Sequence, residues 1–216
     1  RHGTPRQVEF TFAKDTAEVI ARYRFDRHPH AEVDGTIAVE GGTSNLRVKF
    51  RGPGVAHYIL WGDDYTVHKP VGDLTFNGPM LSYDISGGLF GKDMQAKGTV
   101  DLSPKANDYT VNFKAGLFPY GVFGKPLPFG NVVTKVVCKK GFADFDLKAK
   151  LFDGAFSLTG RLDDNKQPQP YQGELRVDAI SFNKFARVYS PEFDTEGDLT
   201  GHTEFTGKLN DWKSLK

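Results

Sequence analysis

The stretch that decides the fold is residues 171–207, YQGELRVDAISFNKFARVYSPEFDTEGDLTGHTEFTG. Apolar and polar side chains alternate strictly over residues 171–179, which predicts a strand with one buried and one solvated face. Ser181 then stands as a candidate N-cap before residues 182–189, whose apolar positions recur at helical spacing. A second alternating strand over residues 198–205 completes a strand–helix–strand unit in which every element has a single apolar face.

Alternation of the same kind recurs along most of the chain. Asp15 and Glu18 have a capping-box-like spacing, which favours a helix over residues 17–25 with a strand as the alternative. The chain contains about a dozen alternating segments, which predict an all-β, mainly antiparallel fold with one or two short helices. The alternating segments are 8–12, 37–39, 46–50, 55–61, 74–76, 81–85, 94–102, 109–115, 132–138, 145–151 and 156–158.

Glycine, proline and aspartate mark the expected connections between these strands. We expect turns at Gly41-Gly42, Asp63-Asp64 and Gly87-Gly88, and a polar loop over residues 163–170. Residues 116–130, GLFPYGVFGKPLPFG, combine prolines, glycines and aromatic residues and predict an irregular apolar loop or a broken strand.

Length and composition bound the class of protein. With 216 residues the chain is expected to form a single domain or segment. The 28 Lys and Arg balance 27 Asp and Glu, which argues against nucleic acid as the main partner. Cys138 is the only cysteine, so an internal disulfide and a cysteine-rich zinc site are excluded.

The sequence contains no recognisable membrane-spanning or export segment. No apolar run approaches the roughly 18 residues that a spanning helix needs, and no signal peptide is found. The chain begins at Arg1 without a Met and stops just after DWKSLK. We therefore expect a fragment of a longer protein, with any membrane tether or export signal outside these residues.

Histidine is the first candidate metal ligand. His28 and His30 would share a face on a strand, as two ligands of one metal do. Pro29 lies between them, however, and no nearby Cys or carboxylate completes a ligand set. A solvated turn is the better interpretation, and we expect no metal and no other cofactor.

Carboxylates and the lone thiol are the remaining reactive groups. Asp63, Asp64, Asp84 and Asp93 could supply a glycosidase-type pair, but Asp is also a default turn residue. Cys138 alternates in phase with the apolar residues of its segment, so it is expected to be buried. We expect no catalytic residues and no enzyme activity; a carbohydrate-active enzyme is the weakest hypothesis.

Residues 15–41 and 181–207 look like two copies of one unit. Each has a short predicted helix, a proline-containing break, a glycine and a new strand. Such repetition predicts an extended, growing sheet; chance likeness between glycine-punctuated hairpins is the alternative.

The sequences SFNKFARVYSPEFDTEGDLTGHTEFTGKLNDWKSL (residues 181–215) and LFDGAFSLTGRL (residues 151–162) carry a family resemblance. They resemble the C-terminal region of the AsmA-like superfamily, which includes AsmA, YhdP and TamB, and residues 141–216 match it best. The resemblance implies a β-rich, groove-like or U-shaped sheet in the periplasm of a diderm bacterium. Such proteins are usually tethered to the inner membrane and are implicated in phospholipid transport and outer-membrane biogenesis.

An apolar face repeated strand after strand must pack on another sheet, close on itself or contact a ligand. A closed β-sandwich is one outcome, and a hydrophobic groove for phospholipid acyl chains, favoured by the resemblance, is the other. A periplasmic scaffolding domain that binds other envelope proteins through its edges and residues 116–130 is the second functional hypothesis. The candidate groove residues are Val111, Phe113, Phe145, Leu147, Leu175, Val177, Leu199 and Phe205.

Overall fold

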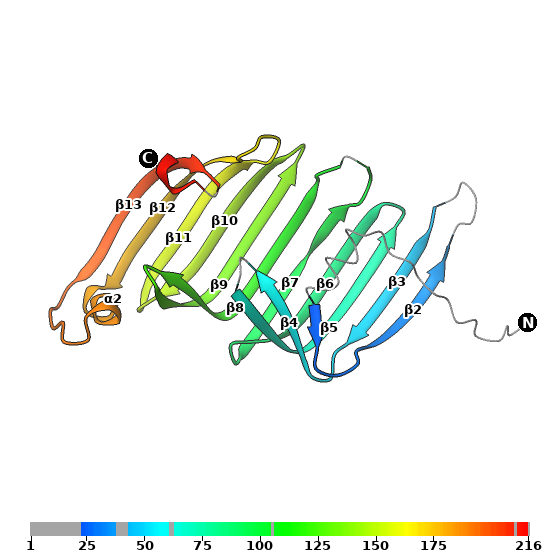
Figure 1. Ribbon diagram of the computed structural model, residues 1–216, viewed down its shortest axis with the longest axis horizontal. Helices are drawn as coiled ribbons and strands as arrows, with labels where there is room; N and C mark the ends of the chain where they lie inside the picture. The colour runs from blue at the N-terminus through cyan, green and yellow to red at the C-terminus, as the bar shows by residue number, and fades with distance from the viewer. Residues whose placement is uncertain (1–22, 38–42, 61–62, 105, 210, 216) are drawn as a thin grey trace, which may run out of the picture.

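The described part of the chain forms one open, curled sheet. The computed structural model describes residues 23–37, 43–60, 63–104, 106–209 and 211–215. Its 13 strands belong to one sheet, and most consecutive strands are joined as hairpins (Figure 1). The strands are β1 (Tyr23–Phe25), β2 (His30–Thr36), β3 (Asn45–Arg51), β4 (Val55–Leu60), β5 (Asp63–Asn77), β6 (Met80–Leu89), β7 (Lys92–Asp101), β8 (Tyr109–Val122), β9 (Lys125–Lys139), β10 (Phe142–Leu151), β11 (Gly154–Asp163), β12 (Pro170–Ser181) and β13 (Asp198–Lys208).

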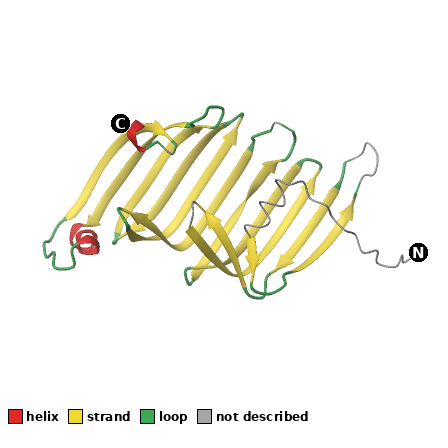
Figure 2. Ribbon diagram, viewed as in Figure 1, coloured by secondary structure: helices red, strands yellow, loops and turns green. Residues whose placement is uncertain are grey.

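The predicted fold class is confirmed. The sheet is antiparallel between every pair of neighbouring strands, and the described helices are one short α-helix and one turn of 3-10 helix, η1 (Trp212–Ser214) (Figure 2). The alternative of a closed β-sandwich is wrong. All the described strands belong to one sheet, so there is no second sheet among them to complete a sandwich.

The strand–helix–strand unit of residues 171–207 forms as predicted. Helix α2 (Phe182–Tyr189) joins β12 to β13. Ser181 is its N-cap, and the Ser181 hydroxyl accepts a hydrogen bond from the Lys184 amide at 3.4 Å. Arg187 Nε donates to the Phe193 carbonyl at 2.9 Å, which ties the loop that follows back to the helix.

The sheet turns a corner at β5. This strand pairs with β6 on one side; on the other, it pairs with β4 through its first half and with β3 through its second. At the corner, Gly52 N donates to the Pro70 carbonyl and Lys69 N donates to the Gly54 carbonyl, both at 2.7 Å. The first half of β5, with β4 and β1, therefore departs from the direction of the main sheet (Figure 1).

Three β-bulges lie close to one line across the sheet. One is in β5 opposite Gly87, one in β9 opposite Ala149 and one in β12 opposite Thr200. Each contains a residue with left-handed backbone: Lys69 (φ 46°), Asn131 (φ 50°) and Ala179 (φ 50°). Because a bulge bends its strand and increases the local twist, this line is where the sheet curls.

The β8–β9 hairpin corrects the irregular loop predicted for residues 116–130. Residues 117–129, here called the hairpin tip, are paired strand, with Pro119 directly opposite Pro128. β7 stops pairing with β8 at Ala115, and β10 stops pairing with β9 at Gly130. Both outer sides of the tip are therefore free edges in the described structure, where a proline removes no ladder hydrogen bond.

Two predicted turns are also corrected. Asp63 and Asp64 begin strand β5 and do not form a turn. Gly87 and Gly88 lie within β6, and the hairpin turn comes after the end of that strand, at Phe90-Gly91. Gly87 serves close packing, because a Cβ there would come within 2.7 Å of Val67 Cγ1.

Several N-terminal predictions fall on residues that the structure does not describe. These are the strand over residues 8–12, the turn at Gly41-Gly42 and most of the helix predicted over residues 17–25. The last three residues of that helix form strand β1, in line with the strand alternative. β2 and β3 form a hairpin, but β2 ends at Thr36, before the strand predicted over residues 37–39.

Candidate functional site

All eight predicted groove residues lie on one face of the sheet, here called the apolar face. Directly opposed residues on neighbouring antiparallel strands point to the same side. Val111 opposes Val136, which opposes Phe145, and the same row ends at Phe205. Phe113, Leu147 and Leu175 belong to the next row, and Val177 and Leu199 lie beyond it on the same face.

The apolar face extends over eleven strands. Three neighbouring rows of it, here called the floor, lie on the far side of the bulge line from α2. The first row contains Leu46, Phe76, Leu81, Val100, Tyr109, Cys138, Ala143, Leu162 and Tyr171; the second Val48, Leu74, Tyr83, Val111, Val136, Phe145 and Phe205; the third Phe50, Ile85, Ala96, Phe113, Leu147, Leu158 and Leu175. Of these residues only Cys138 and Ala143 are fully buried. All the larger floor side chains remain partly open to solvent.

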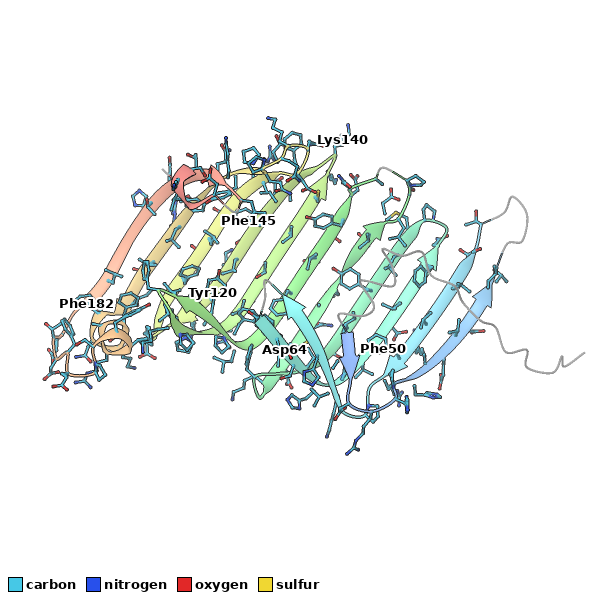
Figure 3. All side chains as sticks on the ribbon, in the orientation of Figure 1. Phe50, Asp64, Tyr120, Lys140, Phe145 and Phe182 are labelled. Atoms are coloured by element: carbon cyan, nitrogen blue, oxygen red, sulfur yellow. The ribbon has the colours of Figure 1, made fainter. Side chains whose placement is uncertain are left out.

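Aromatic rings of the floor lie over the glycines on the neighbouring strands. Phe145 stands directly opposite Gly160, and Phe205 directly opposite Gly173. A Cβ at Gly173 would come within 2.6 Å of the Phe205 ring, so the ring occupies the space that a side chain would fill. Phe50 over Gly72, Tyr83 over Gly98 and Tyr171 over Gly207 repeat this arrangement. Figure 3 labels Phe50 and Phe145, which belong to strands far apart in the sheet.

The other face of the sheet is polar and carries cross-strand ion pairs. Arg161 binds Asp144 with two hydrogen bonds, of 2.6 and 2.9 Å, and Arg47 Nε donates to Asp73 at 3.0 Å. The hydrogen bond from Arg161 holds the pKa of the Asp144 carboxyl below its usual range. Two open hollows of about 580 and 510 Å³ lie largely against this face and its rim, both lined by Arg161 and Gln172.

On the other side of the bulge line the apolar face is covered. The elements that cover it, here called the lip, are the hairpin tip, α2 and the first half of β5 with β4 and β1. Figure 1 shows them along the same lower side of the sheet. The buried core combines two residues of the tip itself, Leu127 and Phe129, with the residues that the lip covers, Leu89, Ala115, Val132, Ala149, Leu151 and Ile180.

Polar and aromatic contacts join the lip elements to one another. Tyr189 of α2 donates a hydrogen bond to the Val122 carbonyl of the hairpin tip at 2.9 Å. On the other side of the tip, Phe118 stacks on Tyr65 of β5 with ring centroids 5.6 Å apart. Lys184 of α2 forms an ion pair with Asp153 of the β10–β11 turn. The lip is thus a continuous structure built from three separate parts of the chain.

The lip divides the eight predicted residues into two groups. Phe113, Leu147 and Val177 pack against the buried core and support the lip. Val111, Phe145, Leu175, Leu199 and Phe205 lie outside that cluster. Sequence reasoning does not predict the lip, because the prolines and glycines of the tip favour a loop. The alternation of Leu127 and Phe129 with Pro126 and Pro128 is the signal that indicates a strand there.

Asp64 and Asp84, two of the carboxylates singled out from the sequence, have different partners. Asp84 lies on the polar face and accepts a hydrogen bond from Gln95 at 2.7 Å. Asp64 is instead next to His57, with Oδ1 3.4 Å from the His57 Nδ1. Cys138 is 1% exposed, as predicted, and burial raises the pKa of its thiol. Within the described ranges no group of three or more His, Cys, Asp or Glu could hold a metal ion. Nor is any described helix long and apolar enough to cross a membrane.

The chain matches no protein-family model, no curated protein and no solved structure. The class of protein is therefore defined by the fold and the site themselves. In the described residues it is one open antiparallel sheet with a polar face and an apolar face. The apolar face is covered by the lip on one side of the bulge line and uncovered over the floor.

Proposed function

We propose that this chain is a non-enzymatic segment of a cell-envelope protein whose floor shields the acyl chains of phospholipid. The observation that carries the proposal is the partly exposed state of the larger floor side chains over ten strands. Isolated apolar residues are common on protein surfaces, whereas a continuous apolar surface marks a binding site.

The chemistry of the floor suits a hydrocarbon chain. Its rows contain aliphatic and aromatic side chains, and aromatic rings fill the space above the glycines in these rows. Each CH₂ group moved from water to such a surface contributes roughly 0.8 kcal/mol. A diacyl lipid lying across the strands would gain that contribution many times, with its headgroup left in water.

The sequence resemblance to AsmA-like proteins supports the setting of the proposal. In that setting the chain belongs in the periplasm of a diderm bacterium, between the inner and outer membranes. A tether to the inner membrane would lie in parts of the protein outside these 216 residues. The role would be to shield or transfer phospholipid during outer-membrane biogenesis.

The test is native mass spectrometry of the purified chain, with a charge placed on each face in turn. Val111→Glu puts a carboxylate in the middle of the floor and is expected to lower recovered phospholipid at least tenfold. Asn112→Glu is the matched control, since the next residue of β8 faces the polar side between Lys97 and Lys135. Equal lipid recovery from folded Val111→Glu, or no lipid from the unmodified chain in the presence of phospholipid, would contradict the proposal.

A second candidate function, protein binding, is favoured by the sheet edges. In the described structure β2 pairs only with β3, and β13 pairs only with β12. An unpaired outer edge can add a strand from a partner. A protein partner recovered without any lipid would favour this scaffolding role over lipid shielding.

A further inference from the structure

Four two-residue hairpin turns of this sheet share one backbone geometry but differ in chemistry. Their central residues all have positive φ: Phe90-Gly91, Phe123-Gly124, Lys140-Gly141 and Phe152-Asp153. Successive hairpins alternate between the two ends of the sheet, so the three turns that begin with Phe lie at the lip end and Lys140 lies at the opposite end (Figure 3).

Phenylalanine is an unfavourable residue for the first position of such a turn. Left-handed backbone is strained for bulky side chains, and Asn, Asp or Gly is preferred there. Two of the three rings are explained by packing, since Phe90 contacts the rings of Tyr65 and Phe118, and Phe152 packs against the buried core. Phe123 is different, because it is 90% exposed.

The protein contacts of Phe123 do not account for its presence. Its described ring contact is with Tyr189 of α2, at a centroid distance of 6.5 Å. Tyr120, on the same hairpin tip, is 48% exposed. A residue that breaks a local rule without a packing gain marks a functional position, and two exposed aromatic rings on one tip are an apolar contact surface.

The charge of the hairpin indicates what that surface contacts. Residues 109–143, which include the whole tip, contain no Asp or Glu, and Lys125 is the only charged residue of the tip itself; of the other lysines in this range, Lys140 lies at the opposite end of the sheet. Lys125 directly follows the turn and is exposed. Exposed aromatic rings beside a lysine, with no carboxylate in the same hairpin, are the chemistry of the bilayer interface, where rings enter the headgroup layer and a lysine contacts anionic lipids.

We infer that the hairpin tip, through Phe123, Tyr120 and Lys125, docks the lip of this sheet on the surface of an anionic lipid bilayer. This inference rests on the proposed function, because docking at the lip would place the floor beside the source or destination of its lipid. The tip is the membrane contact, whereas the floor holds the extracted acyl chain.

The test is flotation of the full chain with vesicles of phosphatidylethanolamine and phosphatidylglycerol. Phe123→Asn is the main variant, because Asn suits left-handed backbone and the turn is then expected to keep or raise its Tm. We expect about tenfold weaker vesicle binding, in line with the loss of one inserted aromatic side chain. Leu102→Ser is the matched control, since Leu102 is also exposed, at 53%, but lies at the opposite end of the sheet.

A charge variant and a floor variant separate the possible outcomes. Lys125→Glu is expected to weaken binding to these anionic vesicles and to leave binding to pure phosphatidylcholine vesicles unchanged. Unchanged flotation of Phe123→Asn, an equal loss in Leu102→Ser, or conversion of a dimer to a monomer by Phe123→Asn would overturn the inference. If Val111→Glu loses its lipid while Phe123→Asn floats normally, the proposed function stands and the docking inference fails.

Discussion

The lip and the floor are two parts of one apolar face that the chain treats in opposite ways. Under the lip, small and large residues of the apolar face such as Ala149 and Leu151 are buried. On the floor, side chains of the same kind, such as Val111 and Leu175, stay partly exposed. The difference shows that apolar alternation determines which side of a strand is apolar, while the covering elements determine whether that side becomes core.

The largest expected effect distinguishes a buried core residue from an exposed residue in one cross-strand pair of the apolar face. Ile180 and Leu199 face each other on β12 and β13, but Ile180 is 1% exposed and Leu199 is 40% exposed. Ile180→Ala is expected to lower the free energy of unfolding by about 2–4 kcal/mol, because it leaves a cavity in the lip core. Leu199→Ala is expected to cost less than about 1 kcal/mol. Chemical denaturation measures both, and equal losses would contradict the claim that the covering elements, and not alternation alone, determine which apolar residues form the core.

A smaller effect is expected from the glycines of the apolar face. Gly173 lies under the Phe205 ring and beside the Thr159 carbonyl oxygen, so Gly173→Ala forces both to move and is expected to cost about 1–3 kcal/mol. Gly201 is on the same face, with no atom within 4 Å of the position of an added Cβ. Gly201→Ala is therefore expected to be neutral or slightly stabilising. Similar destabilisation of both variants by thermal unfolding would mean that the ring does not occupy the space above Gly173.

The sequence predicted the strands more successfully than their ends. Period-two alternation from Val132 to Cys138 and from Phe145 to Leu151 predicted both strands and the face they share. It did not predict Gly87 as a strand residue or Pro119 as part of a hairpin, because glycine and proline have the same local preference in turns and at sheet edges. Which role they take depends on neighbouring strands that are distant in sequence.

The candidate site was predictable as a face but not as a surface with two parts. Register follows from alternation, so all eight predicted residues share one face. The lip depends on the bulges at Lys69, Asn131 and Ala179. Of these three residues, only Asn131 is of a type that commonly has positive φ, so the sequence does not reveal the other two bulges. The contact between Tyr189 and Val122 joins residues 67 positions apart, which no local pattern reveals.

The smallest expected effect comes from the polar face. Asp144 has a lowered pKa because Arg161 donates to its carboxylate. A carboxyl whose pKa is lower in the folded state stabilises the protein above its unfolded pKa of about 3.9, and the contribution is lost as the pH falls through the folded value. Asp144→Asn is expected to cost less than about 1 kcal/mol at neutral pH, since the pair is exposed. The difference from the unmodified chain should shrink towards zero in acid; a difference that grows in acid would contradict this sign.

The most direct measurement of the central claim is photolabelling with a phospholipid that carries a diazirine in its acyl chain, followed by peptide mapping. We expect the label to attach to floor residues such as Val111, Phe145 and Leu175, and the Asn112 side of β8 to stay unlabelled. Labelling spread equally over both faces, or confined to the polar face, would contradict the claim that the floor is the acyl-chain surface.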